Sequence, residues 1–143
     1  MTYEEAVKSI LPGRYRHFKG NEYEVLYIAR HSEDESAMVV YRALYGDCGV
    51  WVRPAEMWNE TVERDGKVYR RFYPLERIER IEKYECLFDE AMKQPDKEKL
   101  AALESYYTSG QWLADYEADE RGELPPDLKR GVLAQDALYD LLS

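Results

Sequence analysis

The hydrophobic period of this chain changes near Leu75. Before that point, aromatic and apolar residues alternate with polar ones, which is typical of strands; after it they recur at three-and-four spacing, as on a helix. The charge changes at the same place, since residues 1–75 carry 11 basic and 12 acidic side chains and residues 76–143 carry 9 and 17. The sequence therefore predicts two domains: a β domain with a short N-terminal helix at 1–75, and an acidic α-helical domain at 76–143.

The N-terminal domain reads as a series of short antiparallel strands. Thr2 and Glu5 have the spacing of a capping box ahead of a helix that ends at Pro12-Gly13. Asp65-Gly66 has the residues of a type I′ hairpin turn. We expect strands at 14–18, 22–31, 37–45, 50–53, 61–64 and 67–72, and one helical turn at 54–58. Because closure removes exposed edges, this strand count favours a small β-barrel of the Src-homology-3-like kind, in an α+β protein.

The longest of these strands has a simple alternating pattern. Four residues, Tyr23, Val25, Tyr27 and Ala29, stand two apart and should share one face.

The second domain shows four apolar stripes. The first is interrupted at Gln94-Pro95-Asp96, where Asp96 can cap the next helix, and Ser109-Gly110 separates the second from the third. The last helix carries Leu133 to Leu142. The dense carboxylates of the third helix, Asp115, Glu117, Asp119 and Glu120, predict a solvated helix face.

Candidate binding residues lie in two short segments where aromatic or apolar residues alternate with basic ones. In a regular strand Arg14 and Arg16 lie on one side, with Tyr15 and His17 on the other. The plain interpretation is a rim strand with its rings packed inward. The functional interpretation is a groove for a flat or anionic ligand, because rings stack and guanidinium groups bind phosphate or carboxylate. The predicted ligand-binding set is Tyr15, His17, Tyr41, Trp51 and Arg53. An ion pair between Arg53 and Glu56 is the rival structural role.

Residues 13–73 resemble the bacterial domain of unknown function 1653 family. The matching residues are Gly13, Tyr15, His17, Lys19, Gly20 and Tyr23, then Val40, Tyr41, Leu44 and Tyr45, then Trp51, Val52, Arg53, Pro54 and Met57. This resemblance implies a small β-barrel with no assigned activity.

Residues from about 78 to 142 resemble a second family, domain of unknown function 4298. The resemblance lies in Tyr106-Tyr107, Trp112, Asp115-Tyr116, Gly122-Glu123-Leu124-Pro125, Lys129-Arg130-Gly131-Val132-Leu133 and the residues 136–142. It implies a small acidic helical domain, also without a known function.

Composition and missing motifs narrow the functional classes. The formal charge of −9 disfavours general nucleic-acid binding, because phosphates would be repelled. We find neither a signal peptide nor an apolar run long enough for a bilayer, and expect a cytoplasmic protein with Cys48 and Cys86 reduced. His17, His31 and Cys48 lack the spacing of a metal site, and Cys48 is a weak candidate nucleophile. We predict no cofactor and no catalytic residue, and leave the oligomeric state open.

Three hypotheses remain. The leading one is a non-enzymatic binding or adaptor module for a small anionic or nucleotide-like ligand or a short peptide. The second is a nucleotide-directed enzyme with His17 as base, which needs a carboxylate or hydroxyl beside His17. The third is a structural protein-interaction module, which predicts an exposed apolar patch on the helices that includes Trp112.

Overall fold

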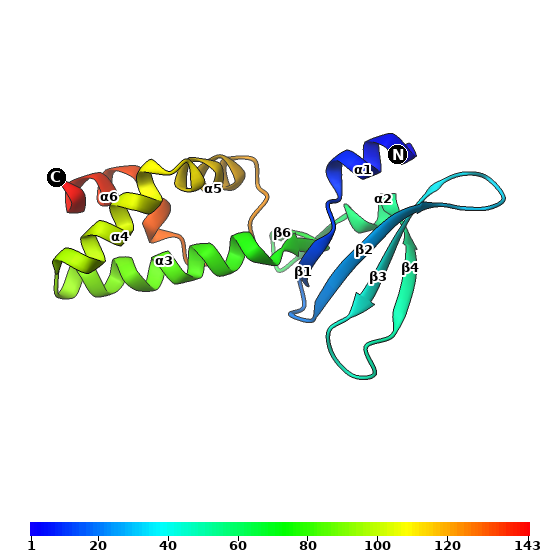
Figure 1. The fold of residues 1–143 in the computed structure, drawn as a ribbon, viewed down its shortest axis with the longest axis horizontal. Helices are drawn as coiled ribbons and strands as arrows, with labels where there is room; N and C mark the ends of the chain where they lie inside the picture. Colours follow the sequence, from blue (N-terminus) through cyan, green and yellow to red (C-terminus); the bar gives the residue numbers. More distant parts are fainter. The chain divides into compact units, whose positions relative to one another are not determined.

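The computed structural model describes residues 1–143 and divides the chain into two compact units, Met1–Glu76 and Arg77–Ser143 (Figure 1). The elements of the first are α1 (Tyr3–Ser9), β1 (Gly13–His17), β2 (Glu22–Arg30), β3 (Ala37–Ala43), β4 (Val50–Pro54), α2 (Ala55–Trp58), β5 (Thr61–Arg64), β6 (Lys67–Arg70) and β7 (Phe72–Pro74).

Local sequence signals account for the ends of several elements. Helix α1 begins with the predicted capping box, in which Thr2 accepts a hydrogen bond from the Glu5 N–H and Glu5 accepts one from the Thr2 N–H. The turn between β5 and β6 places Asp65 at φ 52° and Gly66 at φ 76°, the two positive angles of a type I′ turn. Both predictions are confirmed.

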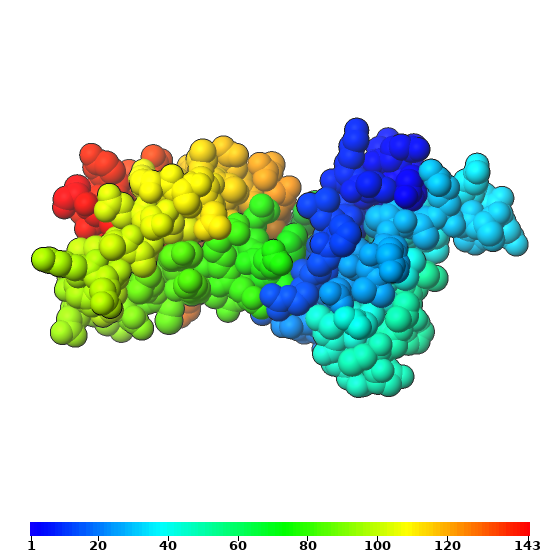
Figure 2. Space-filling model, viewed as in Figure 1, coloured from blue at the N-terminus to red at the C-terminus, as the bar shows by residue number.

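The main sheet has five antiparallel strands in the order β4-β3-β2-β1-β7, and β5 and β6 form a separate hairpin. The mixed α+β class is confirmed. No pairing joins β4 to β7, so the sheet is not closed into a barrel and the Src-homology-3-like barrel is not confirmed. The turns that flank β3 project from the body of this unit (Figure 2).

One face of the sheet carries the core of the first unit. Its members come from α1 and its C-cap residue, from α2, and from the inward side of β1, β2, β3 and β7: Ala6, Ile10, Tyr15, Val25, Ala37, Val39, Tyr41, Ala55, Trp58 and Phe72. The rings make edge-to-face and stacked contacts, the closest being Trp58 on Phe72, with centroids 3.7 Å apart and planes 4° apart.

The predicted alternation along β2 is wrong beyond Val25. A bulge lies between Val25 and Tyr27, where the register with β3 shifts by one residue. Because side chains alternate with a period of two, the shift turns Tyr27 outward, where it is 69% exposed, and turns Ile28 toward the core.

The second unit is helical. Its elements are α3 (Leu75–Lys93), which starts directly after β7, α4 (Lys97–Thr108), α5 (Gln111–Glu120), the 3-10 turn η1 (Gly131–Leu133) and α6 (Gln135–Leu142). Asp96 caps α4 as predicted, accepting a hydrogen bond from the Lys99 N–H. None of the helices has the length and apolar character that crossing a lipid bilayer requires.

Trp112 is a core residue of this unit rather than part of an exposed patch. It is 4% exposed, and its Nε1–H donates to the Val132 carbonyl at 3.0 Å. The Val132 N–H in turn donates to the Glu85 carboxylate at 2.8 Å. A β-carbon at position 131 would lie 2.9 Å from Glu85 Oε1, so a side chain there requires the Glu85 carboxylate to shift.

Candidate functional site

The candidate site lies where the two edges of the main sheet approach each other. Arg53 of β4 places its guanidinium 5.6 Å from the ring centroid of Phe72 in β7, although these strands are at opposite ends of the ladder. Trp58 from α2 stacks on the same Phe72 ring. The sheet is therefore strongly curled, and side chains, not backbone hydrogen bonds, connect its two edges.

Two of the five predicted residues form the buried floor of this face. Tyr15 is 8% exposed and donates its hydroxyl to the Leu11 carbonyl at 2.8 Å. Tyr41 is 7% exposed and lies edge-on to Trp58 with a centroid distance of 5.1 Å. Both rings hold the core together, as the plain interpretation of the sequence expected.

His17 lies on the same face among rings and cations. Its ring is 5.0 Å from Phe72 and 4.5 Å from Phe18, measured between centroids. Burial, together with the positive charges of Arg71, Lys19 and Arg53, lowers the pKa of His17 to about 4. The Lys19 N–H donates to His17 Nδ1 at 3.1 Å, so the neutral ring carries its proton on Nε2.

Trp51 and Arg53 are the exposed part of the predicted set. In β4 they stand two residues apart, opposite Tyr41 and Val39 of β3, so both project from the inner face. Trp51 is 57% exposed. Arg53 forms no ion pair, and the rival contact with Glu56 is absent because Glu56 accepts a hydrogen bond from the Met1 ammonium at 2.7 Å.

Sequence reasoning missed two contributors to this face. Arg71 adds a second guanidinium, which pairs with Glu60 at 3.0 Å, and Phe72 supplies the ring under Arg53. Their only signal is the run Arg70-Arg71-Phe72-Tyr73, which repeats the mixture of cations and rings in Arg14–Phe18. The distance between the two runs along the chain concealed their proximity.

The enzymatic hypothesis receives no support from this geometry. His17 contacts rings and a backbone N–H, and no carboxylate or hydroxyl is hydrogen-bonded to it. A base with a pKa of about 4 is also poorly matched to proton abstraction near neutral pH. The structure contains no group of three or more His, Cys, Asp or Glu side chains that could hold a metal ion, and Cys48 and Cys86 are free, exposed thiols.

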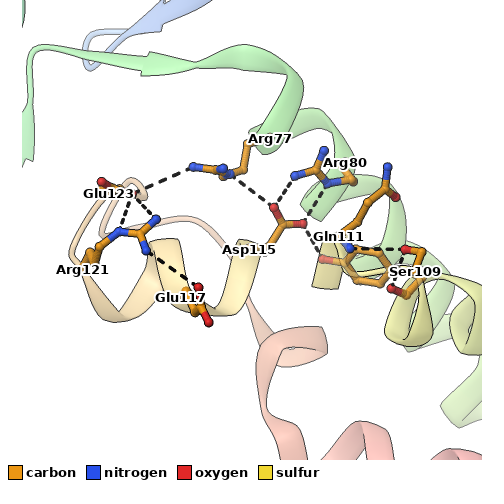
Figure 3. Close-up of polar contacts among 9 residues, drawn as sticks. Arg77, Arg80, Ser109, Gln111, Asp115, Glu117, Arg121 and Glu123 are labelled. Carbon is orange, nitrogen blue, oxygen red and sulfur yellow. Dashed lines mark hydrogen bonds and ion pairs between the residues drawn. The ribbon is translucent and has the colours of Figure 1, made fainter. Parts of the chain in front are cut away.

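A second cluster of charged residues lies inside the helical unit (Figure 3). Asp115 is fully buried, which contradicts the prediction that its whole acidic run is solvated. Arg80 binds it through Nε at 2.9 Å and through Nη2, Arg77 Nε lies 3.3 Å away, and the Tyr106 hydroxyl donates to it at 2.7 Å. Both carboxylate oxygens are occupied by donors from this chain, so the cluster is a structural connection between α3, α4 and α5.

The helical unit also has a shallow pocket of about 180 Å³. Its lining is mostly apolar and consists of Glu104, Tyr107, Thr108, Tyr139, Leu142 and Ser143. None of the predicted site residues lines it, and it contains no convergent set of polar groups. It gives no indication of a ligand class.

Comparisons with known proteins match the two units separately. Residues 13–74 match the family described as protein of unknown function (DUF1653), and residues 76–143 match the domain of unknown function DUF4298. No curated protein sequence matches the chain.

A crystal structure of a DUF1653 protein from Bordetella bronchiseptica is 39% identical over the matched region. The match covers 46% of this chain and 86% of that one, with a TM-score of 0.42. The chain thus belongs to the DUF1653 family through residues 13–74, and residues 76–143 are similar to the DUF4298 domain.

Proposed function

We propose that the first unit is a binding module for a small ligand that combines a flat ring with an anionic group. The observation that carries this proposal is the pair Trp51 and Arg53: an exposed indole and a guanidinium without a carboxylate partner, side by side on one face.

This face presents hydrogen-bond donors and positive charges, and therefore favours a ligand with hydrogen-bond acceptors. Arg53 and Lys19 are cations without an ion pair, and His17 presents an N–H from its neutral ring. The effect of three nearby cations on the His17 pKa indicates a locally positive potential. A phosphate or carboxylate oxygen fits such donors, and a guanidinium can bind it in bidentate geometry.

The exposed ring supplies the second half of the recognition. One end of the Trp51 indole lies close to Gly49, where a β-carbon would be only 3.3 Å from its Nε1. Its remaining surface is open to solvent, and a nucleobase or another aromatic ring can stack on it.

The test is a comparison of ligand binding by the wild type and two pairs of variants. The probe is adenosine 5′-monophosphate, with adenosine and inorganic phosphate as partial probes, measured by calorimetry and thermal shift. Arg53→Gln and Trp51→Ala remove the two proposed contacts. Arg42→Gln and Tyr27→Ala are the matched controls, because Arg42 pairs with Glu24 and Tyr27 is exposed on the outer face.

We expect Arg53→Gln to weaken binding of the monophosphate by about 10- to 100-fold, as a charge-assisted hydrogen bond is worth about 1.5–3 kcal/mol. Trp51→Ala should lower affinity for adenosine and the monophosphate alike, while both controls bind as the wild type does. Equal affinity in the wild type and Arg53→Gln would refute the proposal, as would a wild type that binds none of the three probes.

A further inference from the structure

Strand β4 presents an exposed apolar surface at an edge of the main sheet. Three consecutive residues are open to solvent: Val50 is 61% exposed, Trp51 57% and Val52 62%. Proteins usually protect such an edge with lysine, a bulge or proline. Between Val50 and Val52 there is neither a charge nor a proline, and no bulge interrupts the pairing with β3.

The register shows which backbone groups of β4 are unpaired. The Ala43 N–H donates to the Gly49 carbonyl, and the Leu44 N–H donates to the Glu22 carbonyl. Odd-numbered residues of β3 therefore bond to β4 and even-numbered ones to β2. It follows that Trp51 and Arg53 are bonded to β3, whereas the N–H and C=O of Val50 and Val52 point away from the sheet.

These outward groups match a second copy of the same strand. With a two-fold axis at Trp51, Val50 of each copy lies opposite Val52 of the other, and each pair exchanges two hydrogen bonds. Pro54, which has no N–H, falls outside these bonded pairs. All four outward groups of each copy are then satisfied.

The side chains also fit this arrangement. The two Trp51 rings become a directly opposed, non-hydrogen-bonded pair, the closest kind of cross-strand contact. On the other face Val50 packs beside Val52 of the second copy. Arg53 falls opposite Gly49, where no side chain competes for space. Residues 1–75 have a net charge of −1, so this unit repels its own copy only weakly.

We propose that β4 pairs antiparallel with β4 of a second copy of this chain, with the two-fold axis at Trp51, so that one sheet continues across a homodimer. This interaction surface shares Trp51 with the proposed ligand site, but its hydrogen bonds come from the backbone groups of Val50 and Val52.

The first test is the oligomeric state of the full chain, measured by sedimentation, together with amide hydrogen exchange at several protein concentrations. We expect a concentration-dependent dimer in which the amides of Val50 and Val52 gain protection as the dimer forms. The amides of Trp51 and Arg53 should be protected at every concentration, since β3 binds them. A chain that is monomeric at its highest soluble concentration would overturn the proposal, as would a dimer whose Val50 and Val52 amides exchange freely.

The second test is a pair of charge variants on the outer face. Val52→Glu and Val50→Lys should each weaken self-association by about tenfold or more, because each places a charge against a valine in both symmetric contacts. An equimolar mixture of the two should restore a heterodimer, since the new charges lie opposite each other. Tyr27→Lys, on the outer face away from the edge, is the control and should leave the dimer intact.

Two results would contradict the stated register. One is undiminished self-association of Val52→Glu. The other concerns a mixture of Val52→Glu and Val52→Lys. If this mixture dimerises and the mixture of Val52→Glu and Val50→Lys does not, the two-fold axis lies at Val52. Circular dichroism of each variant verifies its fold, and the wild-type exchange measurement remains decisive if a variant is unfolded.

Discussion

Replacing Asp115 by asparagine should destabilise the helical unit more than any other single change of one charge in it. The carboxylate is fully buried and receives hydrogen bonds from Arg80 and Tyr106, with Arg77 at 3.3 Å. Removing one partner of a buried ion pair costs about 3–5 kcal/mol, because the other charge stays behind. The side chains of Arg77 and Arg80 are 28% and 24% exposed, so water partly solvates them. We therefore expect a loss of about 2–3 kcal/mol in the free energy of unfolding.

Tyr106→Phe isolates one of these contacts. Burial raises the pKa of the Tyr106 hydroxyl, and its hydrogen bond to Asp115 raises it further. Deleting this hydroxyl leaves Asp115 with its arginine donors, so we expect a smaller loss of about 1–2 kcal/mol. In the double variant the two losses should fall short of additivity, because both change the same contact between Tyr106 and residue 115.

The assay is urea denaturation followed by the helix signal in circular dichroism, with Glu117→Gln as the matched control. Glu117 lies on the same helix but is 56% exposed and pairs with Arg121 only at 4.0 Å, so its replacement should cost less than about 0.5 kcal/mol. If Asp115→Asn lost no more than the control, the buried network would not be what connects α3, α4 and α5. Strict additivity with Tyr106→Phe would likewise refute a shared contact.

Two further predictions concern His17 and Gly131. The pKa of His17 is about 4 in the folded protein and 6.5 ordinarily. Between these two pH values the unfolded state binds more protons than the folded state. The stability of the first unit should therefore fall as the pH drops from about 6.5 to about 4. His17→Gln should remove this dependence in pH-resolved urea melts, and a profile identical to that of the wild type would count against it. Gly131→Ala forces Glu85 away from the Val132 N–H and should cost about 1–2 kcal/mol. In thermal melts the destabilisation by Gly131→Ala should be smaller when Glu85 is also replaced by alanine. An equal destabilisation in the Glu85→Ala background would show that displacement of Glu85 is not its cause.

Local signals in the sequence predicted the elements well where the physics is local. The capping box at Thr2, the turn at Asp65-Gly66 and the cap at Asp96 depend on residues within one turn of each other, and all three form as expected. The inward placement of Tyr15 follows from strand alternation for the same reason.

Features that depend on distant residues were not predictable. The bulge that exposes Tyr27 has no residue that announces it, because its cause is the pairing of β2 with β3. Asp115 was expected in solvent because its partner Arg80 lies 35 positions away. The open sheet has a similar origin, since closure requires β4 and β7 to pair, and these edges approach only through Arg53 and Phe72.

The candidate site shows both situations. Trp51 and Arg53 could be placed on one face from their spacing alone, and the structure agrees. Their neighbours Phe72 and Arg71 could not, because the curl of the sheet, not the order of the chain, brings Phe72 beneath Arg53 and Arg71 beside His17.

The two hydrophobic cores have a consequence for synthesis of the protein. The first draws only on residues from Ala6 to Phe72 and the second only on residues from Ile81 to Leu138. Neither core needs a side chain from the other stretch, so the curled sheet has all its core residues before the last three helices have left the ribosome. We expect it to fold during translation, while the acidic helices are still being made.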